Sequence, residues 1–152
     1  MDYYHWSNTL YEPNTFMPIG TFGRWISNQG PLAQEFERLM EERRLLVSPD
    51  APSRLACIFM LKPQEAEGFE PRQHLYKLQP AIGAAVSQHN YKVGTYFSEL
   101  ISSGNQTQIL LETALMDAYW LNNGPYGAQT GQPLHYIPEF LTDQPTLIAE
   151  RR

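Results

Sequence analysis

The sequence predicts a single α+β domain that spans residues 1–152. Three observations support this class: strand-like segments occur near both ends, amphipathic helical patterns lie between them, and the two kinds do not alternate as in a doubly wound sheet. A chain of 152 residues with 42% apolar content is long enough to bury a core without disulfides. We find no internal repeat and no domain linker.

The first third of the chain predicts a strand, a long loop and a helix. Residues 2–7 (DYYHWS) have the aromatic content of a short strand, which carries His5. Residues 7–31 are rich in Gly, Pro, Asn and Thr and predict a loop with at most one short strand or turn. Loops of this length in compact domains are more often functional than idle. Residues 31–46 begin with a proline and repeat apolar residues at helical spacing, so they predict an amphipathic helix. The acidic residues opposite its apolar stripe are Glu37, Glu41 and Glu42.

The rest of the chain predicts short strands and further helices. Residues 55–61 form an unbroken apolar run, too short to span a membrane and too uniformly apolar for an exposed strand, so they predict a buried strand. The other predicted elements, in chain order, are one or two helical turns over 63–69, a strand over 73–80, a loop over 81–92, a helix that ends near Gly104, a helix stopped by NNGPYG, and strands within 135–141 and 146–150.

The distribution of charge argues against a broad surface for nucleic acid. The net charge is −5, and no Lys or Arg occurs between residues 93 and 150. Contacts to a phosphate backbone need clustered basic side chains. In the first half, Arg24 and Arg54 stand apart, because neither has a charged neighbour within three residues. Isolated arginines of this kind suit one small anion better than a long polymer.

Several common kinds of site are missing from the sequence. The single Cys57 precludes an internal disulfide and lies in the apolar run, so it is interpreted as a core thiol. No Cys/His spacing resembles a zinc site, so we expect no metal, and no glycine-rich nucleotide motif, P-loop or nucleophile elbow occurs. No apolar stretch reaches the length of a membrane span, and residues 1–20 lack the layout of a signal peptide. We therefore expect a cytoplasmic protein, or one delivered as an effector by another export signal.

Three candidate sites lie far apart in the sequence. They are His5 on the first strand, the pair Phe59 and Phe69 in the middle, and Glu139 on a late strand. Taken one at a time, each has an ordinary interpretation, as a structural histidine, core aromatics and a solvated glutamate. The other acids considered are Glu112, which helical spacing places near a solvated face, and the weaker candidates Asp117 and Glu99.

Taken together, these sites resemble the ADP-ribosyltransferase fold, in the clade of diphtheria-type toxins and poly-ADP-ribose polymerases. YYHWS looks like that clade's His-x-Ser/Thr opening, CIFML followed by EAEGF is similar to its Gly-Ile-Tyr-Phe segment with a second aromatic downstream, and PEFL looks like its late glutamate strand. The series PIGTFGRW, PSRLACIF, LYKLQP, DAYW and PEFL is also similar to a set of bacterial and phage proteins assigned to this fold. The resemblance spans most of the chain and implies a split β-sheet core with flanking helices.

The resemblance implies a site for NAD, the substrate of this family. Glu139 would stabilise the oxocarbenium ion that forms when the nicotinamide–ribose bond breaks. The expected NAD-binding residues are His5 and Ser7 at the ribose, Arg24 and Arg54 at the diphosphate, and Phe59 and Phe69 around the nicotinamide. Phenylalanine at position 59 departs from the family's tyrosine, so a phenol hydroxyl is missing there.

The predicted function is mono-ADP-ribosyl transfer from NAD to a macromolecule, either a protein side chain or a nucleic-acid base. Arginine-directed members of the fold carry an acid two residues before the catalytic glutamate, and Ile137 at that position disfavours arginine as the acceptor. Two alternatives stay open: hydrolysis of NAD by the same residues, and a non-catalytic module that binds a nucleotide or a partner protein. Phosphate transfer from RNA ends, also found on this fold, needs several arginines, and Arg24 and Arg54 alone disfavour it.

Overall fold

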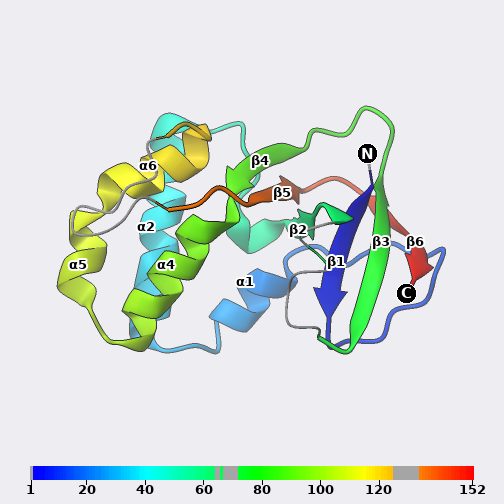
Figure 1. Ribbon diagram of the computed structural model, residues 1–152, viewed down its shortest axis with the longest axis horizontal. Coiled ribbons are helices and arrows are strands. Elements are labelled where there is room, and N and C mark those ends of the chain that lie inside the picture. Colours follow the sequence, from blue (N-terminus) through cyan, green and yellow to red (C-terminus); the bar gives the residue numbers. More distant parts are fainter. Residues whose placement is uncertain (1, 64–65, 67–71, 125–133) are drawn as a thin grey trace.

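The structure is a computed structural model that describes residues 2–63, 66, 72–124 and 134–152. A six-stranded antiparallel sheet is flanked by helices, which confirms the α+β class (Figure 1). The strands lie in the order β4-β5-β2-β1-β3-β6. Their bounds are β1 Tyr3–Ser7, β2 Ile58–Leu61, β3 His74–Pro80, β4 Ser87–Asn90, β5 Pro138–Thr142 and β6 Thr146–Arg151.

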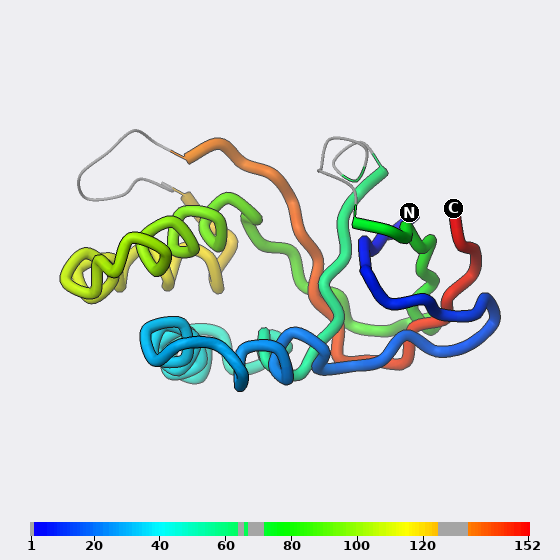
Figure 2. Tube along the Cα trace, turned by 90° about the horizontal axis from the view of Figure 1, so that it is seen from below, coloured from blue at the N-terminus to red at the C-terminus, as the bar shows by residue number. Residues whose placement is uncertain are grey.

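The helices gather at one end of the molecule, and β1, β3 and β6 lie at the other (Figure 2). Their bounds are α1 Thr21–Ile26, α2 Pro31–Val47, the 3-10 turn η1 Arg54–Ala56, α4 Tyr91–Ser102, α5 Gln106–Leu111 and α6 Thr113–Leu121. Asn90 caps α4, because its side chain accepts a hydrogen bond from the backbone N–H of Lys92. Within the described residues, none of the helices has the length and apolar character that a membrane span requires.

Each face of the sheet covers its own core. Successive residues of β5 point to opposite faces, so Leu141 packs among the helices and Phe140 packs on the other side. We call the first the helix-side core; its buried residues are Phe36, Met40, Ala51, Cys57, Val93, Phe97, Ile109, Leu115, Met116, Tyr119, Trp120 and Leu141. The second is the strand-side core, which consists of Met17, Ile58, Met60, Tyr76, Leu78, Phe140 and Ile148.

The sheet opens between β1 and β2. These two strands pair only through Tyr4 and Leu61, whereas β1 forms five residue pairs with β3, and β2 forms four with β5. We call the opened stretch, from His5 to Ser7 of β1 and from Ile58 to Met60 of β2, the seam. The seam lies between two groups of strands within the one sheet, β1, β3 and β6 on one side and β2, β5 and β4 on the other.

Most predicted elements are present, and four segments differ from the prediction. The single helix predicted to be stopped by NNGPYG is two helices, α5 and α6, which meet at Glu112. The helix over 31–46 and the strand over 73–80 are confirmed as α2 and β3. The loop predicted over 7–31 contains α1, and the loop predicted over 81–92 contains β4 and the start of α4. The strand predicted over 55–61 begins as η1 and becomes extended only at Ile58. Of the turns predicted over 63–69, the structure describes Pro63 and Ala66, both helical.

Candidate functional site

Glu139 lies in the interior, on the helix-side face of β5. Its register partners are Leu61 on β2 and His89 on β4, so these three side chains leave the sheet on the same face. Only 5% of Glu139 is exposed. A glutamate is rarely buried this deeply unless it is paired, so its partners decide what it can do.

Arg54 and Tyr119 provide those partners. Arg54 Nη1 donates a hydrogen bond to the Tyr119 hydroxyl at 2.9 Å, and that hydroxyl donates to Glu139 Oε1 at 2.6 Å. Arg54 Nη1 also lies 3.6 Å from Glu139 Oε1, close enough for a direct ion pair. The three residues come from η1, α6 and β5, so the site joins the helices to the sheet.

Glu37 anchors the other side of the guanidinium. Arg54 Nε lies 3.1 Å from Glu37 Oε2, and Arg54 Nη2 lies 3.1 Å from Glu37 Oε1. Glu37 is 3% exposed and Arg54 is 7% exposed, so this is a buried, forked ion pair. We call Glu37, Arg54, Tyr119 and Glu139 the charge cluster.

Local sequence explains why the Arg54 side chain enters the core. The hydroxyl of Ser53 accepts a hydrogen bond from the N–H of Leu55 at 3.2 Å and caps η1, which begins at Arg54. The guanidinium carbon then lies 5.2 Å from the ring centre of Phe22 and 5.3 Å from that of Phe59. These cation–π contacts surround the charge with aromatic faces in place of water.

The charge cluster holds two carboxyl groups and one guanidinium. Burial disfavours the charged guanidinium, but Glu37, Tyr119 and Glu139 together raise the pKa of Arg54 well above its usual range. Burial also raises the pKa of Glu139, while Arg54 and the Tyr119 hydrogen bond act in the opposite direction. The cluster thus sets two carboxyl groups against one guanidinium, in an apolar setting where charge interactions are strong.

His89 fixes the ring of Tyr119 from the far side. The two rings stack with centroids 4.6 Å apart, and His89 Nδ1 lies 2.7 Å from the backbone carbonyl oxygen of Tyr119. His89 Nε2 lies 2.8 Å from the hydroxyl of Ser87. Burial lowers the pKa of His89 to about 4, so the imidazole is neutral at pH 7. A neutral histidine adds no charge to the cluster.

His5 lies at the seam, where its side chain forms a hydrogen bond to the backbone of β2. Its Nδ1 lies 2.8 Å from the backbone carbonyl oxygen of Phe59, and burial lowers its pKa. His5 pairs in register with Tyr76 of the strand-side core. Its side chain therefore leaves the sheet on the face opposite to Glu139. The two side chains therefore do not converge in one cleft, contrary to the sequence-based expectation; His5 contacts the backbone of Phe59 on the neighbouring strand.

Four predicted residues remain, and the structure describes three of them. Ser7 is buried at the end of β1, where its hydroxyl accepts a hydrogen bond from the N–H of Thr9 at 3.0 Å. Arg24 is exposed on α1 and donates to the carbonyl oxygen of Ile19 at 3.1 Å. Phe69 lies outside the described residues. Arg54 differs most from expectation: its guanidinium is buried and already balanced by acids, so the geometry does not favour a contact with a diphosphate.

Two expectations about acids were wrong. Glu37 was placed on the polar face of its helix, yet it is buried, because Phe36 and Met40 beside it on α2 turn toward the core. Glu112 was placed near solvent, yet it is 1% exposed and accepts a hydrogen bond from Gln108 Nε2 at 2.6 Å. In both cases a nearby polar or basic partner makes burial tolerable.

Tyr119, Glu37 and His89 are the site residues that sequence reasoning missed. A signal existed for Glu37, since it lies three residues before Met40 and shares a helix face with it. Tyr119 belongs to the DAYW motif and was assigned to an apolar helical stripe, which says nothing about its hydroxyl. His89 lies in a segment without strand propensity and carried no signal.

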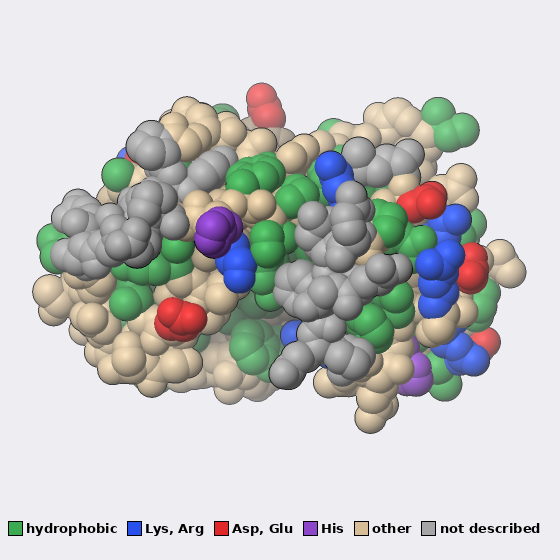
Figure 3. Space-filling model, in the orientation of Figure 1, with side chains coloured by type: hydrophobic (Ala, Val, Ile, Leu, Met, Phe, Trp, Pro, Cys, Tyr) green, Lys and Arg blue, Asp and Glu red, His purple; other side chains and the backbone are tan. Residues whose placement is uncertain are grey.

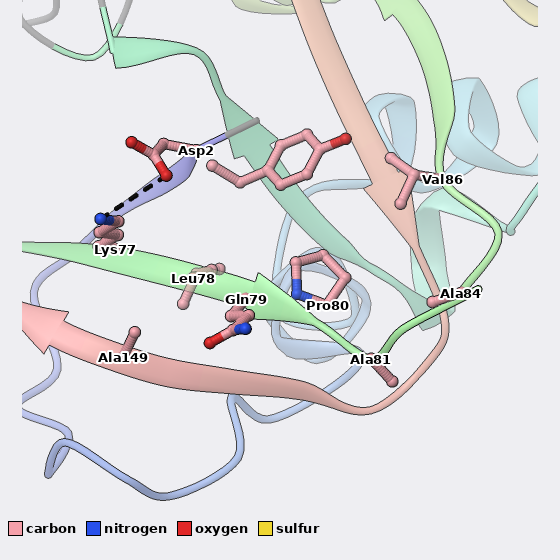
Figure 4. A pocket seen from close by; sticks show the side chains of 10 residues that line it. Asp2, Lys77, Leu78, Gln79, Pro80, Ala81, Ala84, Val86 and Ala149 are labelled. Carbon is pink, nitrogen blue, oxygen red and sulfur yellow. Dashed lines mark ion pairs between the residues drawn. The ribbon is translucent and has the colours of Figure 1, made fainter.

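A hollow of about 470 Å³ lies elsewhere, beside β3 and β6 (Figure 4). The Asp2–Lys77 ion pair at 3.6 Å and the small side chains of Ala81, Ala84 and Ala149 line it. At this end of the molecule, acidic and basic side chains intermingle on the face shown in Figure 3. The hollow contains none of the buried charged groups, so the charge cluster is the better candidate for chemistry.

No metal is indicated within the part of the chain that the structure describes, because no three His, Cys, Asp or Glu side chains there come together as ligands. No protein-family model matches the chain, and no curated protein is similar enough to count as a relative. The functional argument therefore depends on the geometry of the charge cluster and the seam.

Proposed function

We propose that the protein cleaves the bond between nicotinamide and ribose in NAD and transfers ADP-ribose to a macromolecular acceptor. The observation that carries the proposal is the geometry of the cluster, in which two buried carboxyl groups, those of Glu37 and Glu139, face the single guanidinium of Arg54. A buried excess of negative charge favours a ligand that brings a positive charge. The nicotinamide ring of NAD is a cation, and the charge moves to the ribose as the bond breaks.

Glu139 is assigned to stabilise that moving charge. The carbon–nitrogen bond breaks, its electron pair leaves with the now neutral nicotinamide, and a cation forms on the ribose, as in glycoside hydrolysis. A nucleophile of the acceptor then bonds to the same carbon and releases a proton. The carboxylate of Glu139 remains unchanged throughout, and fixed charges of this kind commonly contribute about 3–4 kcal/mol to the transition state.

The seam is the proposed entry to this carboxylate. The ring of Phe59 lies at the seam, packs against Phe22 at 5.1 Å, and shares a sheet face with Glu139. We assign Phe59 to the nicotinamide, and His5 supports it through the hydrogen bond to the carbonyl oxygen of Phe59, because the His5 side chain lies on the face of the sheet opposite to Glu139. Phe69 as the second aromatic and Ser7 near the ribose stay predictions.

The diphosphate assignment passes to Arg24 alone. Arg24 is exposed and lies on α1, two residues after Phe22, whereas Arg54 is occupied inside the charge cluster. A bidentate guanidinium is well suited to a phosphate. The acceptor is a protein side chain or a nucleic-acid base, and the segments around the seam would select it.

The test is release of nicotinamide from NAD by the purified protein, with and without cell lysate, for the wild type and Glu139→Gln. The rate should fall about 10²–10³-fold in Glu139→Gln, the loss typical of removing one preorganised electrostatic group. Glu112→Gln is the matched control, because it removes another buried carboxylate that lies outside the charge cluster.

Each outcome decides between the candidate functions. Release that lysate increases and that Glu139→Gln abolishes supports transfer to a macromolecule. Release that lysate does not change supports an NAD glycohydrolase. Absence of release from folded wild-type protein would overturn the proposal and leave a nucleotide-binding or partner-binding module, which calorimetry with NAD would then test.

A further inference from the structure

We propose that Tyr119 is the positioning residue for Glu139: its hydroxyl fixes one carboxylate oxygen, Oε1, and leaves the other, Oε2, for the ligand. This inference rests on the proposed function for its catalytic meaning. It goes beyond the resemblance, which assigns no role to the helix that carries Tyr119.

The direction of the two hydrogen bonds at the Tyr119 hydroxyl is the first support for this role. A tyrosine hydroxyl has one proton to donate. Because Arg54 Nη1 donates to this oxygen at 2.9 Å, the hydroxyl proton is directed to Glu139 Oε1 at 2.6 Å. The direct distance from Arg54 Nη1 to Glu139 Oε1 is 3.6 Å, which is too long for a hydrogen bond. The hydroxyl, and not the guanidinium, therefore sets the position of the carboxylate.

The surroundings keep the hydroxyl in place. The ring of Tyr119 is held by the stacked ring of His89 and by the edge of Trp120, whose centroid lies 5.0 Å away. Trp120 in turn donates its indole N–H to the backbone carbonyl oxygen of Met40 at 2.8 Å. Arg54 is oriented by its fork with Glu37. A catalytic group supported in this way by locked neighbours is held to a narrow geometry.

The second carboxylate oxygen is left for a ligand. Within the described part of the chain, Glu139 accepts its side-chain hydrogen bond through Oε1, and Oε2 accepts none. Leu61, its cross-strand neighbour on β2, adjoins the seam. An ionised carboxylate with one oxygen held and one oxygen available can accept a hydroxyl of the ribose without losing its own support.

The charged and titratable groups around Glu139 come from every element packed against it. They are Arg54 from η1, Glu37 from α2, Tyr119 from α6, His89 from β4, Tyr91 from α4, and Cys57 just before β2. Among them, Arg54 and Tyr119 favour the ionised form of Glu139, and Glu37 disfavours it. Removal of the Tyr119 hydroxyl should therefore raise the pKa of Glu139.

The experiment compares Tyr119→Phe with Tyr76→Phe. Both tyrosines are fully buried, but the hydroxyl of Tyr76 donates to the backbone carbonyl oxygen of Thr9 in the strand-side region. The carboxyl carbon of Glu139 is titrated by ¹³C NMR, with its signal assigned by its loss in Glu139→Gln. We expect its pKa to rise in Tyr119→Phe and to stay unchanged in Tyr76→Phe.

Kinetics supply the second readout. For nicotinamide release, kcat should fall about 10- to 100-fold in Tyr119→Phe, as expected when a hydrogen bond to a charged group is lost, while KM changes little. Tyr76→Phe should leave both constants near the wild type. If Tyr119→Phe matches Tyr76→Phe in the titration and in kcat, the inference is overturned.

The two proposals fail in different ways. If the wild type releases no nicotinamide, the proposed function falls, and the NMR titration still decides whether Tyr119 controls Glu139. If Tyr119→Phe does not fold, the hydroxyl proton of Tyr119 in the wild type supplies the answer. That proton should exchange slowly with water and shift when Glu139 is replaced by Gln, and rapid exchange or an unchanged shift would exclude the hydrogen bond.

Discussion

The cores on the two faces of the sheet differ in whether charged side chains are buried with them. The strand-side core is assembled from seven buried residues, and none of them is charged. The helix-side core is larger, and Glu37, Arg54 and Glu139 are buried beside it. Burying an ion pair costs desolvation energy and often adds no net stability compared with apolar packing. The charge cluster is therefore a feature that the packing of the helix-side core alone does not require.

The largest effect on stability is expected when the central charge is removed. Arg54→Met leaves Glu37 and Glu139 buried without a counter-charge and should lower the free energy of unfolding by about 3–5 kcal/mol. Urea unfolding followed by tryptophan fluorescence measures it. Arg38→Met is the control, since the Arg38 side chain is 57% exposed beside Glu35, and such surface pairs contribute at most about 1 kcal/mol. Equal losses of unfolding free energy in the two variants would mean that the charge cluster contributes no more to stability than a surface ion pair does.

A cavity in the strand-side core should lower the free energy of unfolding and leave the rate of nicotinamide release unchanged. Leu78→Ala in β3 removes a side chain that is 2% exposed in the strand-side core, so unfolding should become easier by about 2–5 kcal/mol. Below the unfolding transition, the rate of nicotinamide release per folded molecule should stay at the wild-type level. A fall in that rate would show that the two faces are coupled and would weaken the division drawn between them.

The smallest expected effect is a change in the pH dependence of stability when Glu139 is replaced by Gln. Burial raises the pKa of Glu139 above the 4.5 of an ordinary glutamate. As the pH rises from about 4.5, the unfolded chain loses this proton before the folded chain does, so the stability of the wild type falls until the folded pKa is passed. Glu139→Gln lacks this loss, so its stability relative to the wild type should increase between pH 4 and pH 7. Thermal unfolding at the two pH values measures this trend, and a relative stability that is unchanged or lower at pH 7 would contradict it.

The elements that could be predicted from the sequence are those with a local signal of their own. Pro31 and the apolar spacing after it define α2, and the alternating residues of 73–80 define β3. The strand β4, with the sequence SQHN, has no such signal, and its extended form depends on pairing with β5. The helix α1 contains Gly23 and was hidden in a polar stretch, because its packing partner η1 lies thirty residues further along the chain.

The candidate site also contains some residues that the sequence singled out and others that only the fold identifies. Glu139, Arg54 and Phe59 were singled out from the sequence, and the structure brings these three together. Tyr119 could not be identified, because its hydroxyl is defined by partners that are 65 and 20 residues away. The buried ion pair of Arg54 could not be predicted for the same reason, since an isolated arginine in the sequence gives no sign of a glutamate that lies close to it in the fold. Local patterns report which side chains are available, and only the fold reports their partners.

Gly23 lies on a surface helix, but the backbone packed beneath it leaves no room for a side chain. A Cβ atom at this position would lie 2.2 Å from the carbonyl oxygen of Leu55, so α1 touches η1 backbone against backbone. Leu55 directly follows Arg54, and Phe22 beside Gly23 packs on the guanidinium. Any larger residue would push the helix away and disturb the ion pair beneath it. In natural or laboratory variation, this position on a surface helix should therefore tolerate as little change as a residue at the centre of the protein.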